Sequence, residues 1–277
     1  MQLLGADPPR DLVLTTWPGF VFDTETTGVD VSRDRVVELG AIGCDGSGLR
    51  DARKMRLDPK MPIPAAASAI HGIYDEHVRG KPTFEAIAAR FLEYLTGQAQ
   101  GHAAPWLCGY NALGFDVPLL NAELRRAGIE VQIDTANVVD PMVFVRWHLR
   151  HLRSRSLESA CQHLGIPLLR AHSALDDATA TLKLLLAMVE RGLMPRTLGE
   201  VLDEQARLAK LMQAEWEQYS YWLYHDRTDG RLRLGAGSYC GRYLGEVSSD
   251  YLQSLVHKVA DLPAKVRETF LAHPQAA

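Results

Sequence analysis

Two acidic residues stand two positions apart at the end of an apolar run. Residues 20–22 (FVF) lead into Asp23 and Glu25. Because side chains alternate along a strand, both carboxylates would point to one face. Like charges this close need a cation, and oxygen ligands suit Mg²⁺ or Mn²⁺ better than zinc or copper. A solvated acid pair at a strand end is the simpler interpretation unless other acids converge on it.

A second group of polar residues lies far along the chain, where residues 171–177 read AHSALDD. Ser173 and Asp176 have the spacing of a capping box, which predicts that a helix begins after Ser173. His172 would then precede the cap and Asp177 would follow the first turn, two positions that pack together. Asp177 would sit on a rigid helix, as a metal ligand should. A histidine without any chemical role is the alternative for His172.

A third acid, Asp116, follows the run CGYNALGF at 108–115 and precedes an expected helix. Taken alone, an aspartate in this place is a good N-cap. A structural cap and a role in catalysis are compatible, so both interpretations stay open.

Three segments together resemble a known family. FDTETTG at 22–28, GYNALGFD at 109–116 and AHSALDDA at 171–178 are similar, in order and rough spacing, to motifs of the DEDDh (DnaQ-like) 3′-to-5′ exonucleases, which include proofreading subunits and RNase T. The resemblance implies that two divalent cations, Mg²⁺ or Mn²⁺, bind to Asp23, Glu25, Asp116 and Asp177, with His172 as the catalytic general base. It covers about residues 18–192 and implies an α/β, ribonuclease-H-like fold with a mixed five-stranded sheet flanked by helices.

The same resemblance implies a set of substrate contacts. Residues 70–73 (IHGI) are similar to the family segment that lies against the terminal nucleotide, and Asn111 matches a family asparagine. Phe22, Ile70 and Phe115 are candidate apolar neighbours of a terminal base, although each could be ordinary core. The predicted substrate-binding residues are Thr24, Thr26, Ile70, His71, Gly72, Asn111 and Phe115.

A basic stretch between the second and third motifs suits phosphate contacts, which carry no sequence information. A solvated charged segment explains the same residues equally well. The stretch contains Arg146, His148, Arg150, His151, Arg153 and Arg155.

The elements that must position these residues alternate in type. Residues 20–22, 36–42 and 106–110 have strand character, whereas apolar residues recur at helical spacing in 82–95, 117–127 and 173–191. This alternation favours a layered α/β fold. Gly192 and Pro195 end the last helix, so we expect an exonuclease domain over 1–195, a helical linker over 196–225 and a small C-terminal module over 226–277.

The C-terminal module weakly resembles one appended to exonuclease-X-like proteins, which usually reads FGKYKG. Ser238 and Cys240 stand where its lysines would be, so a phosphate-binding role is in doubt. Arg231, Arg233 and Arg242 could compensate, and a structural or protein-contact role is an equal alternative.

The composition limits which partners, which cellular location and which cysteine-based sites are expected for this chain. The chain has 277 residues, of which 47% are hydrophobic, and its 30 Lys and Arg against 34 Asp and Glu give a net charge of −4. No overall positive field draws it to nucleic acid or membrane, so contacts must be local. We expect a cytoplasmic protein without a membrane partner, since no export signal or long apolar span is present. The four cysteines are widely spaced, which argues against a zinc knuckle and gives no sign of a disulfide framework.

Together with the resemblance, these features predict an enzyme that removes nucleoside 5′-monophosphates from a nucleic acid 3′ end. The C-terminal resemblance favours DNA over RNA, and single-stranded DNA is the expected partner. Two alternatives remain: an RNase T-like or oligoribonuclease-like RNA exonuclease, and a non-catalytic nucleic-acid-binding or polymerase-associated subunit. The presence of all five expected catalytic residues argues against the latter. DNA repair or proofreading in a polymerase or repair complex, and a homodimer, are open possibilities.

Overall fold

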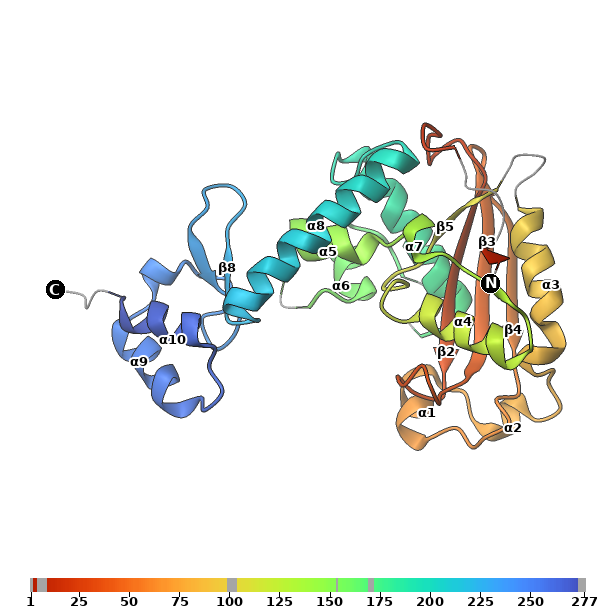
Figure 1. Ribbon diagram of the computed structural model, residues 1–277, viewed down its shortest axis with the longest axis horizontal. Helices are drawn as coiled ribbons and strands as arrows, with labels where there is room; N and C mark the ends of the chain where they lie inside the picture. Colours follow the sequence, from red (N-terminus) through yellow and green to blue (C-terminus); the bar gives the residue numbers. More distant parts are fainter. Residues whose placement is uncertain (1, 4–8, 99–103, 153, 169–171, 274–277) are drawn as a thin grey trace. The chain divides into compact units, whose positions relative to one another are not determined.

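The computed structural model describes residues 2–3, 9–98, 104–152, 154–168 and 172–273 (Figure 1). Two compact units divide the chain, the first formed by residues up to 149 with 155–206 and the second by 150–154 with 207–277. Among the described residues, none of the helices is both long and apolar enough to cross a lipid bilayer.

A mixed five-stranded sheet forms the centre of the first unit, as predicted. Its order is β4-β3-β2-β5-β7. β2 is antiparallel to β3, β3 is antiparallel to β4, and β2, β5 and β7 are mutually parallel. The strands are β2 (Gly19–Thr26), β3 (Val36–Asp45), β4 (Gly48–Arg56), β5 (Trp106–Cys108) and β7 (Val138–Val139), with a separate parallel pair β1 (Gln2–Leu3) and β6 (Val131–Gln132).

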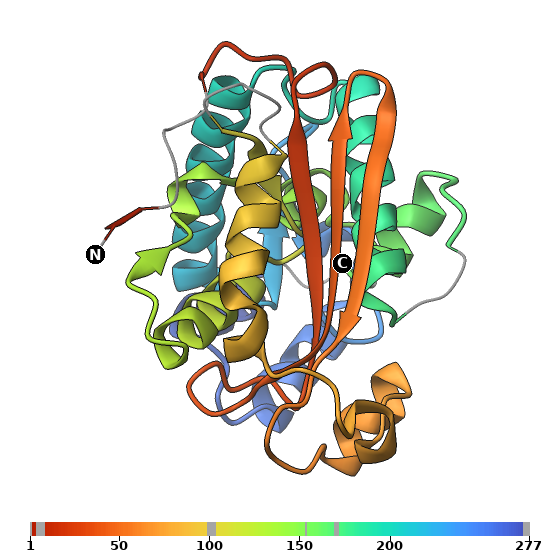
Figure 2. The same ribbon diagram turned by 90° about the vertical axis from the view of Figure 1, so that its right-hand side faces the viewer.

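Helices cover both faces of the sheet, with α3 on one side and α7 on the other (Figure 2). Phe20 and Phe22 of β2 point toward α3 (Phe84–Gly97) and α4 (Asp116–Arg126) and belong to one buried apolar cluster with both helices. Asp23 and Glu25, which alternate with these residues along β2, point to the opposite face, where α7 (Ala174–Glu190) packs. The remaining helices of this unit are α1 (Ala65–His71), α2 (Asp75–Val78), the 3₁₀ turn η1 (Thr135–Asn137), α5 (Pro141–His148) and α6 (Leu157–His163).

The second unit has a core of its own. α8 (Leu198–Tyr219) contributes its last part to this unit, whose core includes Tyr219, Trp222 and Phe270. The C-terminal part of this unit therefore begins within α8, at Arg207, because the end of that helix supplies core side chains. Its other elements are β8 (Leu223–His225), antiparallel to β9 (Leu232–Leu234), η2 (Leu244–Glu246), α9 (Ser249–Lys258) and α10 (Ala264–Leu271).

Arginines of the second unit contact its own side chains. The guanidinium carbons of Arg231 and Arg233 lie 3.7 and 3.6 Å from the centre of the Tyr243 ring. Each also forms an ion pair, with Asp229 and Asp226 respectively. These contacts stabilise the β8–β9 hairpin, which gives the two arginines a structural role.

Glu215 near the end of α8 is a second polar centre of this unit. Its carboxylate accepts hydrogen bonds from the backbone N of His225 and from Arg150, and Arg227 lies 3.3 Å away. Burial alone would raise the pKa of Glu215, but these hydrogen bonds outweigh it and hold the pKa below the usual 4.5. Arg150 also stacks on Tyr224, so it contributes to folding and is not left for phosphate.

We expect Glu215→Gln to destabilise the second unit by about 1–3 kcal/mol at pH 7, because the hydrogen bonds from His225 and Arg150 would no longer be made to a charged group. A lowered pKa gives stability that is present above the usual value and lost as pH falls through the folded value, so the difference from wild type should shrink below pH 4.5. Amide hydrogen exchange of residues 223–234, measured in both proteins at pH 7 and pH 3, gives this difference in stability. An equal difference at pH 7 and pH 3 would contradict this role.

Candidate metal centre

Three carboxylates from distant parts of the chain meet at one end of β2. Asp23 and Glu25 project from that strand, and Asp177 projects from the start of α7. One oxygen of each lies within 4.8 Å of the others. A cation bound by oxygens at 2.0–2.6 Å can contact ligands so spaced after small rotations of the side chains. The expected convergence of these residues is therefore present.

The neighbouring strand lets α7 approach. Asp23 pairs with Gly40 of β3. A Cβ at Gly40 would lie 2.2 Å from the backbone carbonyl carbon of Ala174, so only glycine permits this contact between strand and helix. The pairing of β2 with β3 shifts register between Glu25 and Thr26, just past the acids. Such irregularities are frequent beside functional sites.

Asp116 reaches the same end of β2 from the start of α4. Its carboxylate Oδ1 accepts a hydrogen bond from the hydroxyl of Thr24 at 2.6 Å, and Thr24 points away from the face that carries Asp23 and Glu25. Asp116 is buried but lies outside the cluster of three. It is the first residue of α4, after the N-cap Phe115, so the N-cap interpretation was wrong by one position.

Burial is the main cause of the raised pKa values of these acids, and their mutual repulsion adds to it for Asp23 and Glu25. Burial, reinforced by the charges of Asp116 and Asp177, raises the pKa of Asp23 well above its usual value. Burial and Asp177 raise the pKa of Glu25 to about 8. The pKa of Asp116 rises to about 6, because burial outweighs the bond from Thr24. The negative charges of these carboxylates repel one another, and a divalent cation would supply the positive charge that balances them.

His172 stands where the helix-start pattern placed it. Its backbone N donates to Oδ2 of Asp177 at 3.1 Å, and its side chain is exposed. The φ of His172 is +64°, an unusual value for a residue other than glycine. Ser173 is the N-cap as predicted, but the capping box is absent, because the hydroxyl of Ser173 bonds no helix N–H. It accepts from Lys54 Nζ at 3.4 Å. Residue 171 lies outside the described residues.

His71 connects the 70–73 segment to the end of β2. Its Nδ1 accepts from the backbone N of Ile73, and its Nε2 lies 3.1 Å from the carbonyl oxygen of Thr26. Burial lowers the pKa of His71, which favours the neutral ring with the proton on Nε2. Gly72 ends α1 with φ +69°, and Ile70 is 61% exposed. The segment that His71 anchors at the end of β2 thus carries an exposed apolar side chain.

The other predicted substrate contacts differ in availability. The hydroxyl of Thr26 donates to the carbonyl of Gly28 at 2.7 Å, and that of Thr24 is used by Asp116. Asn111 has a left-handed φ of +62°, and Phe115 is half-buried. Phe22 is fully buried in the core, so its suggested contact with a base was wrong. Arg153 of the basic stretch lies outside the described residues.

Asp140 was missed from the sequence. One of its carboxylate oxygens accepts from the backbone N of Asn111 at 2.9 Å and from that of Met142, and the other accepts from Leu113. Burial, partly offset by these bonds, raises the pKa of Asp140 to about 6. It therefore anchors the loop that leads to Asp116. An aspartate directly before Pro141 is the local signal, because Asp at the N-cap with Pro at N1 starts many helices.

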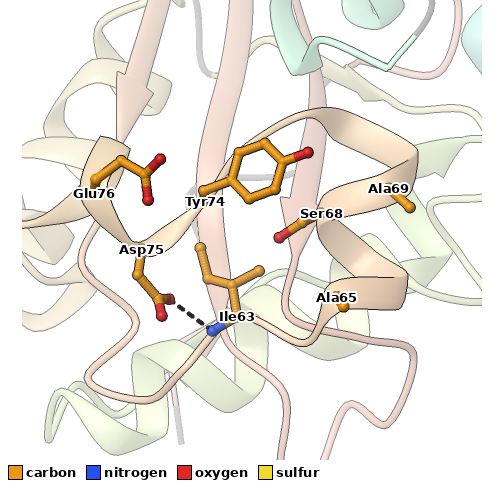
Figure 3. A pocket seen from close by; sticks show the side chains of 7 residues that line it. All are labelled: Ile63, Ala65, Ser68, Ala69, Tyr74, Asp75 and Glu76. Carbon is orange, nitrogen blue, oxygen red and sulfur yellow. Dashed lines mark hydrogen bonds between the residues drawn. The ribbon is translucent and has the colours of Figure 1, made fainter.

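A pocket elsewhere in this unit is lined by α1, α2 and the residues before them (Figure 3). Asp75 in its wall accepts a hydrogen bond from the backbone N of Ile63 at 2.9 Å. Asp75 belongs to no cluster of potential metal ligands among the described residues. The lining residues are Ile63, Ala65, Ser68, Ala69, Tyr74, Asp75 and Glu76.

Comparison with known proteins agrees with the geometry. Residues 20–185 match the RNase T family model, described as exonuclease. The chain is 30% identical over 171 residues to DNA polymerase III subunit epsilon of Treponema pallidum, covering 61% of this chain and 74% of that subunit. It is 28% identical over 171 residues to the PolC-type DNA polymerase III of Caldanaerobacter subterraneus, covering 62% of this chain but 11% of that polymerase.

The fold is similar to that of E. coli exonuclease I, whose structure was solved in complex with a dT13 oligonucleotide. The TM-score is 0.55 at 18% identity, covering 89% of this chain and 61% of that one. At an identity this low, the similarity between the two structures shows a shared fold alone.

We expect Asp23→Asn to raise the melting temperature of the metal-free protein by about 2–4 °C, because one of several repelling carboxylates is removed. The same change should abolish the rise that Mn²⁺ causes in wild type by binding the folded state. Thermal unfolding with and without MnCl₂ measures both effects. Asp203→Asn, at an exposed ion pair with Arg10, is the control and should keep the Mn²⁺ effect. Retention of that effect by Asp23→Asn would refute the metal centre.

Proposed function

The chain belongs to the RNase T exonuclease family, and we propose that it is a metal-dependent 3′-to-5′ exonuclease that releases nucleoside 5′-monophosphates from DNA. The meeting of Asp23, Glu25 and Asp177 within 4.8 Å, next to His172, is the observation that carries this proposal. The matching family model and the relatives named above support it.

Four carboxylates would hold two divalent cations: the cluster of Asp23, Glu25 and Asp177, and Asp116, whose charge acts on Asp23. Such ions lower the pKa of an attacking water and stabilise charge on the phosphate and on the departing sugar oxygen. Thr24 orients the Asp116 carboxylate. The raised pKa values of these acids fit a site that is completed by cations.

His172 would take the proton of the attacking water. Its side chain is exposed, and its backbone is tied to the Asp177 carboxylate. An imidazole near neutral pH can accept a proton. The hydrogen bond to Asp177 keeps this residue beside the metal ligands.

The terminal nucleotide would lie against the segment anchored by His71. Ile70 offers an exposed apolar surface there, and Gly72 keeps the approach open because it has no side chain. Phe115, the N-cap of α4, and Asn111, in the loop before it, would contact the sugar or base from the other side. Apolar contact with any base makes such binding tolerant of sequence.

DNA is the proposed substrate class because the relatives are DNA polymerase III chains, and because the structure of similar fold was solved with an oligodeoxynucleotide. The same names support a role in proofreading or repair beside a polymerase.

The purified chain should shorten single-stranded DNA labelled at its 5′ end into a ladder, and should release labelled mononucleotide at once from DNA labelled at its 3′ end. Both reactions should require Mg²⁺ or Mn²⁺. Matched RNA oligonucleotides test the sugar preference. Faster RNA cleavage would overturn the assignment to DNA, and no cleavage of either would overturn the activity.

We expect His172→Ala to lower kcat by about 10²–10⁴-fold, the usual contribution of a general base, with a much smaller change in KM. Single-turnover and steady-state kinetics on single-stranded DNA give both values. His257→Ala, on α9 of the second unit, is a matched control and should leave turnover unchanged. Near-wild-type turnover of His172→Ala at saturating substrate would remove the base assignment.

A further inference from the structure

Glu38 lies beside the acid cluster but is not part of it. It pairs with Glu25 across β2 and β3, so both side chains lie on the face covered by α7. Its side chain is 2% exposed. One carboxylate oxygen accepts from the backbone N of Ala174 at 3.2 Å, and the other accepts from Arg56 Nε at 3.2 Å. A buried acid from the sheet thus bonds the first residue of a helix.

This contact replaces an ordinary helix cap. The first N–H groups of a helix have no partner within it, and a side-chain oxygen of the N-cap residue usually accepts one of them. Ser173 occupies the N-cap of α7 but makes no such bond. The carboxylate of Glu38 accepts from the helix end instead, where negative charge is favoured by the helix dipole.

Glu38 and Gly40 together determine where α7 begins. These two residues are the β3 partners of Glu25 and Asp23. Gly40 allows the backbone of Ala174 to touch the strand, and Glu38 bonds that same residue. Asp177 follows Ala174 by three residues, less than one helical turn. Any movement of the helix start would therefore move this metal ligand.

We propose that Glu38 is a positioning residue for the metal centre: its carboxylate fastens the start of α7 to β3 and so holds Asp177 against Asp23 and Glu25. This proposal rests on the proposed function for its effect on catalysis, but not for its effect on metal binding. A role in stability alone would leave the Mn²⁺ affinity of a folded Glu38 variant unchanged, which separates it from a positioning role.

Two substitutions separate positioning from charge and from stability. Glu38→Ala removes the acceptor, whereas Glu38→Gln can keep an oxygen for the N–H of Ala174. We expect Glu38→Ala to weaken Mn²⁺ binding by about 10–100-fold, as loss of a residue behind metal ligands does. Its kcat on single-stranded DNA should fall with little change in KM. Glu38→Gln should stay within about threefold of wild type in Mn²⁺ affinity, as retention of that hydrogen bond requires.

Isothermal titration calorimetry of the full chain with MnCl₂ gives the affinity, and circular dichroism at the same temperature confirms folding. Ile87→Ala, in the core of α3 on the opposite face of the sheet, controls for lost stability and should keep wild-type affinity. Wild-type Mn²⁺ affinity of folded Glu38→Ala would overturn the proposal. Equal losses in Glu38→Gln and Glu38→Ala, or in Ile87→Ala and Glu38→Ala, would overturn it as well. Failure of wild type to cleave DNA, with the Mn²⁺ results as expected, would overturn the proposed function alone.

Discussion

Repulsion among crowded, partly buried carboxylates is the constraint around which this fold is arranged. Asp23, Glu25 and Asp177 have oxygens within 4.8 Å of one another, and burial raises the pKa of Glu25 to about 8. Side chains in such a place would move apart if the backbone allowed it. The protein prevents this by mounting two of them on a central strand and the third on a helix held close to the neighbouring strand. This arrangement holds the three side chains rigidly, which is the property that a metal site needs.

Alternation along β2 explains how acids from three segments can share one location. Asp23 and Glu25 point toward α7, whereas Thr24 points to the opposite face and bonds Asp116 of α4. One short strand thus collects ligands from helices on both sides of the sheet. His71 at the C-terminal end of the same strand adds the segment that carries the exposed Ile70.

Much of this could be predicted from the sequence because it depends on local patterns. The strand period placed Asp23 and Glu25 on one face, and the helix start placed His172 beside Asp177. Contacts between distant residues could not be predicted in this way. Nothing local shows that Glu38 bonds the N–H of Ala174 in place of Ser173, or that the carboxylate of Asp140 holds the loop at Asn111. Both depend on β3 and α5 being packed against segments far away in the chain.

A crystal structure with bound Mn²⁺, located by anomalous scattering, tests the central claim most directly. The account predicts a peak at the end of β2, about 2.0–2.3 Å from carboxylate oxygens of Asp23, Glu25 and Asp177. Absence of a peak there at saturating Mn²⁺, or a peak bound only by other residues, would contradict it.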